Sequence, residues 1–137
     1  MTDTGEVRTE TANCVAKVTF SHPKGNSLPG QLLRSLANTF TSLSSDDQVR
    51  VILLTSNGEK AFCAGASFDE LIAIEDERAG LEFFSGFAHV INAMRKCPKP
   101  IVCRAQGKVV GGGVGLVSAS DYALAHSSAS VKLSELA

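Results

Sequence analysis

Short apolar runs along the chain predict four strands. Residues 13–21 mix Val15 and Phe20 with polar neighbours, which is typical of a half-exposed strand. Residues 49–55 form a nearly continuous apolar run, which favours a strand that is covered on both faces, as in parallel sheets. Residues 101–105 and 122–126 predict two further strands of the same sheet.

Apolar residues that recur every three or four positions predict the helices between these strands. This spacing covers residues 28–43 and about 79–96, and Pro98 and Pro100 forbid continuation of the second helix. Ser67 is expected to cap a short helix that extends to Ile72. Residues 116–120 are expected to be helical as well. One face of the helix over 79–96 should carry Phe84, Phe87, Ala88, Ile91 and Met94.

The resulting order β-α-β-α-β-α-β predicts an α/β layered structure with right-handed crossovers. A chain of 137 residues with 44% hydrophobic residues is expected to form a single domain over 1–137. The net charge of −1 does not favour a nucleic acid or a membrane as a partner. Without a recognisable signal peptide or membrane span, the expected location is cytoplasmic.

The four cysteines do not suggest a metal centre. They are Cys14, Cys63, Cys97 and Cys103, and no pair of them forms a Cys-x-x-Cys motif. With three histidines in the whole chain, a structural zinc site is not expected, and we predict no metal-binding residues. We expect all four thiols to be small buried hydrophobic groups in a reducing cytoplasm rather than disulfides.

Two loops of small residues could carry chemistry. Ala64-Gly65-Ala66 follows the buried strand over 49–55, and Gly111-Gly112-Gly113 precedes a helix. Both loops leave backbone N–H groups unobstructed, and the first N–H groups of a helix have no partner within it. Two such groups that converge would stabilise a negative charge on a carbonyl oxygen. Tight packing between helix and strand would explain the glycines equally well at this point.

The order and spacing of four segments resemble the crotonase, or enoyl-CoA hydratase/isomerase, superfamily. These segments are Phe62–Ala66, Pro98–Val102, Gly111–Gly113 and Asp121, and the resemblance covers nearly the whole chain. It implies a crotonase-like spiral of ββα units, of which this sequence would be the N-terminal portion. It also implies that the C-terminal part and the trimerisation helices of the family are absent from these residues, and that the longer protein would be a homotrimer or a dimer of trimers.

The resemblance implies an acyl-CoA thioester as the substrate, with no cofactor other than the coenzyme A of the substrate itself. By position in the family motifs, Ala66 and Gly112 would donate the two N–H groups of an oxyanion hole. Glu135 would be the catalytic acid/base, in an apolar acyl pocket. Further contacts with the acyl-CoA are expected from Lys24, Ala64, Gly65, Ser67, Phe68, Gly111 and Gly115.

One position departs from the pattern of the family's hydratases. These enzymes commonly use two glutamates, and Gly115 stands where the first would be, whereas Glu135 matches the second. A single glutamate can move one proton between two carbons, which resembles the family's enoyl-CoA isomerases. A hydratase with an unusual second group, a decarboxylase and an inactive module that only binds CoA or packs against a partner remain alternatives. A dinucleotide site at Gly113–Ser118 is disfavoured because its third glycine is replaced.

Overall fold

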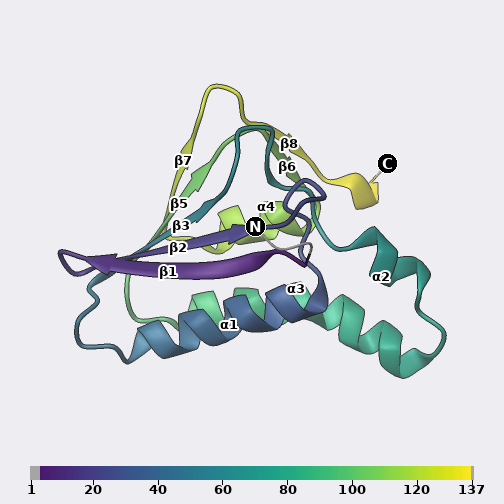
Figure 1. The fold of residues 1–137 in the computed structure, drawn as a ribbon, viewed down its shortest axis with the longest axis horizontal. Helices are drawn as coiled ribbons and strands as arrows, with labels where there is room; N and C mark the ends of the chain where they lie inside the picture. Colours follow the sequence, from purple (N-terminus) through teal and green to yellow (C-terminus); the bar gives the residue numbers. More distant parts are fainter. Residues whose placement is uncertain (1–3, 137) are drawn as a thin grey trace.

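The computed structural model describes residues 4–136, which form two sheets and the helices that cover them (Figure 1). The larger sheet has the order β1-β2-β3-β5-β7, and all its pairs are parallel except the antiparallel pair β1–β2. Its strands are β1 (Glu6–Ala12), β2 (Val15–Ser21), β3 (Val51–Ser56), β5 (Ile101–Ala105) and β7 (Tyr122–Ala125). The smaller sheet is parallel and contains β4 (Ala61–Cys63), β6 (Lys108–Val110) and β8 (Ser130–Lys132).

Two long helices, α1 (Gly30–Ser44) and α3 (Glu77–Lys96), pack side by side against the larger sheet (Figure 1). The shorter elements are α2 (Phe68–Ile72), α4 (Gly112–Ala119) and the 3-10 helix η1 (Ser134–Leu136). The core between these layers is apolar, and its largest fully buried side chains include Phe20, Phe40, Phe62, Leu28, Leu36, Ile52, Leu54, Ile101 and Leu116. No helix within residues 4–136 is long and apolar enough to cross a membrane.

The chain confirms the expected α/β class and the spiral of ββα units. The pairs β3–β4, β5–β6 and β7–β8 each place their first strand in the larger sheet and their second in the smaller one. A helical segment follows every pair. Because β4 and β6 are parallel neighbours, the loops that leave their carboxyl ends meet at one edge of the smaller sheet. This topology brings the two small-residue loops together.

Four strands were not predicted. Three of them, β4, β6 and β8, have only three residues each, which is too short for a period of two to appear. The fourth, β1, has the polar sequence EVRTETA and forms an edge of the larger sheet, where solvent takes the place of a covering layer. The region 60–68, expected to be a loop, therefore begins with a buried strand.

Some predicted boundaries and exposures were wrong. Strand β2 begins at Val15, because Asn13 and Cys14 both adopt left-handed backbone angles in the preceding turn. Its second half is buried rather than half-exposed, and the Thr19 hydroxyl lies 3.0 Å from that of Thr55 on β3. Helix α3 begins two residues before the predicted start, where the Asp76 side chain accepts the N–H of Ala79, the third residue of the helix, at 2.7 Å.

The cysteines differ in their environment. All four are free thiols, and Cys63 and Cys103 are buried as expected. Cys97 is half-buried at the end of α3. Cys14 is exposed in the turn between β1 and β2, so the expectation of burial is wrong for this residue.

Candidate functional site

A cavity of about 420 Å³ opens where the loops after β4 and β6 meet α2, α3 and η1. Its walls combine backbone from small residues with aromatic and aliphatic side chains and one carboxylate. The lining residues are Ala64, Gly65, Ala66, Ser67, Phe68, Leu71, Phe83, Phe84, Gly111, Gly112, Ser134 and Glu135. Eight of the ten residues predicted from the sequence are therefore brought together in one hollow.

The backbone of the first loop is held from its far side. The Leu28 N–H donates to the Gly65 carbonyl at 2.8 Å, and the Ala64 N–H donates to the Gly25 carbonyl at 3.1 Å. Gly65 has a φ of +96°, a left-handed angle that other residues rarely adopt. Within the part of the chain that the structure describes, the Ala66 N–H has no hydrogen-bond acceptor. It is therefore free for a ligand in the cavity.

The second loop presents the start of helix α4. Gly112 is the first residue of this helix, so its N–H lies before the first intrahelical acceptor. The loop is anchored by the Gly111 N–H, which donates to the Lys132 carbonyl at 2.9 Å. A Cβ placed on Gly65 would lie 3.9 Å from the Gly112 nitrogen, which shows how closely the two loops approach. The geometry supplies two adjacent backbone donors beside one cavity.

Glu135 lies in η1 and faces the same loop. A Cβ on Gly111 would be 3.4 Å from its Oε2 atom, and the Ser134 hydroxyl donates to this oxygen at 3.1 Å. The residue is exposed in this chain. The expected burial of Glu135 in an apolar pocket is therefore wrong for residues 4–136, although its place at the cavity is as expected.

Comparison with known proteins identifies the class. A model of the enoyl-CoA hydratase/isomerase family matches residues 10–137. The chain belongs to the enoyl-CoA hydratase/isomerase family. It is 36% identical to the methylglutaconyl-CoA hydratase of Rattus norvegicus over 110 residues. This aligned region covers 80% of this chain and 35% of that protein. It is 30% identical over 125 residues to a carnitinyl-CoA dehydratase of Escherichia coli, covering 88% and 46% respectively.

Solved structures of the family share the fold. An enoyl-CoA hydratase of Bacillus anthracis has a TM-score of 0.88 at 31% identity, over 95% of this chain and 51% of that chain. An enoyl-CoA hydratase of Mycobacterium smegmatis has the same TM-score at 28% identity, with the same shares covered. The chain thus spans about half the length of these family members, and between 35% and 46% of the two curated relatives named above.

Two predicted family positions lie outside the main cavity. Lys24 lines a neighbouring hollow of about 330 Å³, which shares Ala64, Ala66, Ser67 and Phe68 with the main one. Its ammonium group pairs with the carboxylate of Asp69. Gly115 does not line either hollow. It faces α3, where a Cβ would meet the Cδ1 atom of Ile91 at 2.9 Å, so this glycine serves helix packing.

Sequence reasoning missed the apolar wall of the cavity. Phe83, Phe84 and Leu71 supply this wall, and the two phenylalanine rings meet edge to face at 4.9 Å. Phe84 was expected on the apolar face of this helix and is 71% exposed, because α3 extends beyond α1 at its N-terminal end (Figure 1). Helical spacing identifies the apolar face of a helix but not where the opposing layer stops.

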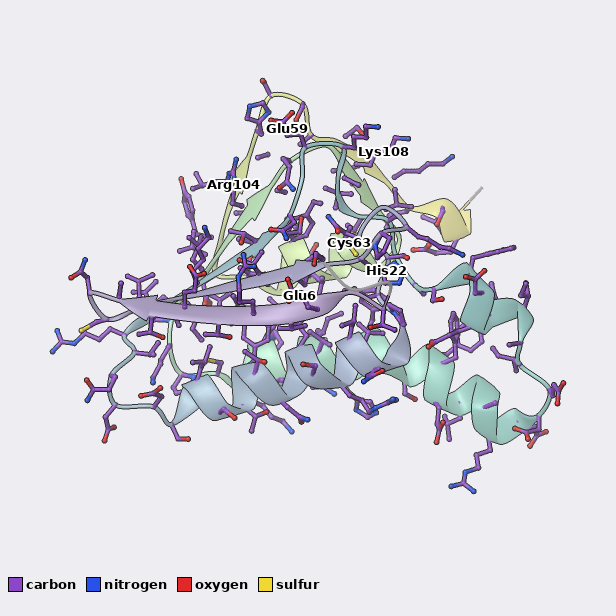
Figure 2. The ribbon with its side chains drawn as sticks, viewed as in Figure 1. Glu6, His22, Glu59, Cys63, Arg104 and Lys108 are labelled. Carbon is purple, nitrogen blue, oxygen red and sulfur yellow. The ribbon has the colours of Figure 1, made fainter. Side chains whose placement is uncertain are left out.

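Two titratable groups near the loops have shifted pKa values. Burial raises the pKa of Cys63 to about 12, so its thiol stays protonated and is not a nucleophile at neutral pH. Burial, and secondly the charge of Lys24, lowers the pKa of His22, while Asp69 opposes this shift. Figure 2 shows His22 and Cys63 on the side of the molecule that carries α2. Among residues 4–136, no three His, Cys, Asp or Glu side chains are grouped to hold a metal ion.

Proposed function

We propose that this chain forms the thioester-binding part of an acyl-CoA enzyme that stabilises an enolate. The observation that carries the proposal is the convergence of the free Ala66 N–H, the N-terminus of α4 at Gly112 and the Glu135 carboxylate on one cavity. Each group comes from a different ββα unit, and the parallel pairing of the smaller sheet brings them together. Family membership supplies the substrate class.

In the proposed reaction, the Glu135 carboxylate takes a proton from the carbon next to the thioester carbonyl. The electron pair of the broken C–H bond moves to the thioester oxygen, which becomes negatively charged. The N–H groups of Ala66 and Gly112 stabilise this charge, and loss of one such donor typically costs about 3 kcal/mol of transition-state stabilisation. When Glu135 returns the proton to another carbon of a conjugated enolate, the double bond migrates and no water is consumed.

The single glutamate favours this proton shuttle over hydration. Addition of water needs one group to accept a proton and another to deliver one. Glu135 is the one carboxylate among the residues that line the cavity, and Gly115 faces Ile91 instead. The names of the relatives describe water addition or removal for those proteins. For this chain we propose the isomerase type of chemistry.

The neighbouring hollow offers a place for the coenzyme A part of the substrate. It shares one side of the first loop with the main cavity, so one extended ligand could contact both. Lys24 supplies a positive charge there, which suits a phosphate of coenzyme A. A bound phosphate would compete with Asp69 for this ammonium group.

Deuterium uptake tests the proposal directly. The chain is incubated with butyryl-CoA in D₂O, and mass spectrometry measures deuterium at the carbon next to the carbonyl. We expect uptake that Glu135→Gln lowers at least about a hundredfold. Glu82→Gln, an exposed glutamate on α3 outside the cavity, is the matched control and should not change uptake. The proposal is refuted if the unaltered chain shows no deuterium uptake and calorimetry detects no binding of butyryl-CoA.

A further inference from the structure

We propose that Asn26 is a positioning residue that sets the direction of the Ala66 N–H. The inference rests on the proposed function of that N–H as a donor to the thioester oxygen. Asn26 lies in the turn between β2 and α1, and its side chain touches neither of the two hollows described above. It would act through the backbone of the first loop.

The Asn26 side chain closes its own turn. Its Oδ1 atom accepts the His22 N–H at 2.9 Å, while its backbone N–H donates to the His22 carbonyl at 3.0 Å. Asn26 is 6% exposed and has a left-handed φ of +57°. Asparagine tolerates this angle better than other side-chain-bearing residues. The turn is therefore held in one conformation by both the side chain and the backbone of a single residue.

The same side chain fixes the turn to the start of β4. Its Nδ2 atom donates to the Asn57 carbonyl at 2.7 Å and to the Ala61 carbonyl at 2.8 Å. These two carbonyls lie on either side of the connection between β3 and β4. Because β4 leads directly into the first loop, Asn26 fixes the turn and the loop in a common frame.

Two backbone hydrogen bonds then carry this placement to the donor. Gly25, directly before Asn26, and Leu28, two residues after it, hold the first loop: the Gly25 carbonyl accepts the Ala64 N–H at 3.1 Å, and the Leu28 N–H donates to the Gly65 carbonyl at 2.8 Å. The Gly65 carbonyl and the Ala66 N–H belong to one planar trans peptide unit, so they point in opposite directions. A donor that holds the carbonyl on one side therefore aims the N–H to the other side.

The chain contains a matched control for this residue. Asn13 also has a left-handed φ, of +52°, but it is exposed in the β1–β2 turn and belongs to neither hollow. Asn26→Gly keeps the backbone angle and removes all three side-chain hydrogen bonds. Asn26→Asp keeps the acceptor for the His22 N–H but loses both donors. Asn13→Gly reproduces the change of residue type without touching the loop.

The experiment measures three quantities on each variant: amide hydrogen exchange at Ala64 and Leu28, the Kd values of butyryl-CoA and of free CoA, and unfolding by urea. Free CoA lacks the thioester carbonyl, so a change confined to butyryl-CoA reports the donor. We expect both Asn26 variants to weaken butyryl-CoA binding at least about tenfold, with free CoA changed less than about twofold. Amide exchange at Ala64 and Leu28 should accelerate in both Asn26 variants. Asn13→Gly should change neither this exchange nor the Kd values.

The outcomes separate this inference from the proposed function. If the unaltered chain binds butyryl-CoA no better than free CoA, the donor role of Ala66 fails, and the exchange data alone decide whether Asn26 holds the loop. If the chain discriminates but the folded Asn26 variants discriminate equally well, the positioning role is refuted. If the urea titrations show that both variants are already unfolded without urea, hydrogen exchange in the unaltered chain decides. The positioning role is refuted if the side-chain amide of Asn26 exchanges faster than the backbone amides of Ala64 and Leu28.

Discussion

The Glu70 carboxylate accepts the backbone N–H of Gly30 with both oxygens, at 3.1 and 3.0 Å. Gly30 is the first residue of α1, and the preceding Pro29 has no side chain that could cap the helix. Glu70 therefore caps α1 from a different helix, with a negative charge at the positive end of the helix dipole. The same contact holds α2, which has no buried residue of its own, against the body of the protein.

Glu70→Ala is expected to lower the free energy of unfolding by about 1 kcal/mol, because the first turn of α1 loses its cap. Urea titration measures this change. Glu75→Ala, an exposed glutamate between α2 and α3 without such a contact, should change stability by less than about 0.5 kcal/mol. Equal effects of the two substitutions would show that the contact does not stabilise α1.

Two glycines of α4 should differ in their tolerance of alanine. A Cβ on Gly113 would lie 2.8 Å from the Cys63 carbonyl oxygen, which is backbone, whereas a Cβ on Gly115 would meet only the flexible end of Ile91. Gly113→Ala is expected to destabilise the fold by about 2 kcal/mol or more, and Gly115→Ala by less than about 1 kcal/mol. Thermal or urea unfolding of both variants decides, and the reverse order would contradict the packing described for α4.

The four thiols should differ in reactivity. Burial raises the pKa of Cys103 to about 12, with a secondary contribution from Cys63, whose own pKa burial also raises to about 12. At pH 8 the exposed Cys14 should react first with a disulfide reagent, while these two should react at least about a hundredfold more slowly. All four should react at similar rates in denaturant. Fast labelling of Cys63 in the folded chain would contradict its burial.

His22 should make stability depend on pH in the acidic range. Burial and the charge of Lys24 lower its pKa, so the unfolded chain binds a proton more readily than the folded one. Its contribution is fully present above the ordinary value of about 6.5 and is lost as the pH falls below it. His22→Asn should reduce the loss of stability between pH 7.5 and pH 5 in urea titrations.

The control for His22 is His126→Asn, in the turn after β7. The two histidines make similar contacts, because each Nδ1 atom accepts a backbone N–H two residues later, at 3.1 Å for His22 and 3.0 Å for His126. Because His126 is exposed and His22 is half-buried, the control should alter the pH dependence less than His22→Asn does. A larger effect at His126 would assign the acid sensitivity to the other turn.

Local sequence patterns predicted those elements that are long enough to show a period. The helical spacing over 28–43 matches α1, and the apolar run over 49–55 matches β3. The strands of the smaller sheet were missed because three residues carry no period, and their pairing is set by contacts between distant segments. The resemblance to the family supplied the spiral that short-range patterns could not.

The site was predicted less completely than the fold. Small residues identified the two loops, because a backbone that must stay accessible excludes large side chains. Position in the chain could not distinguish Gly112, which lines the cavity, from Gly115, which packs on Ile91. Nor could it identify Asn26, since its role depends on carbonyl groups of residues 57 and 61, which its side chain meets only after folding.

The peptide unit between Gly65 and Ala66 has a consequence for how the protein can change over evolutionary time. The groups that hold and aim it are main-chain atoms of Leu28 and Gly25, which every residue type except proline possesses in full. Apart from Asn26, the side chains around the loop can drift widely while the donor keeps its direction. A protein built in this way can exchange the walls of its cavity, and with them its choice of ligand, without rebuilding the backbone that presents this N–H.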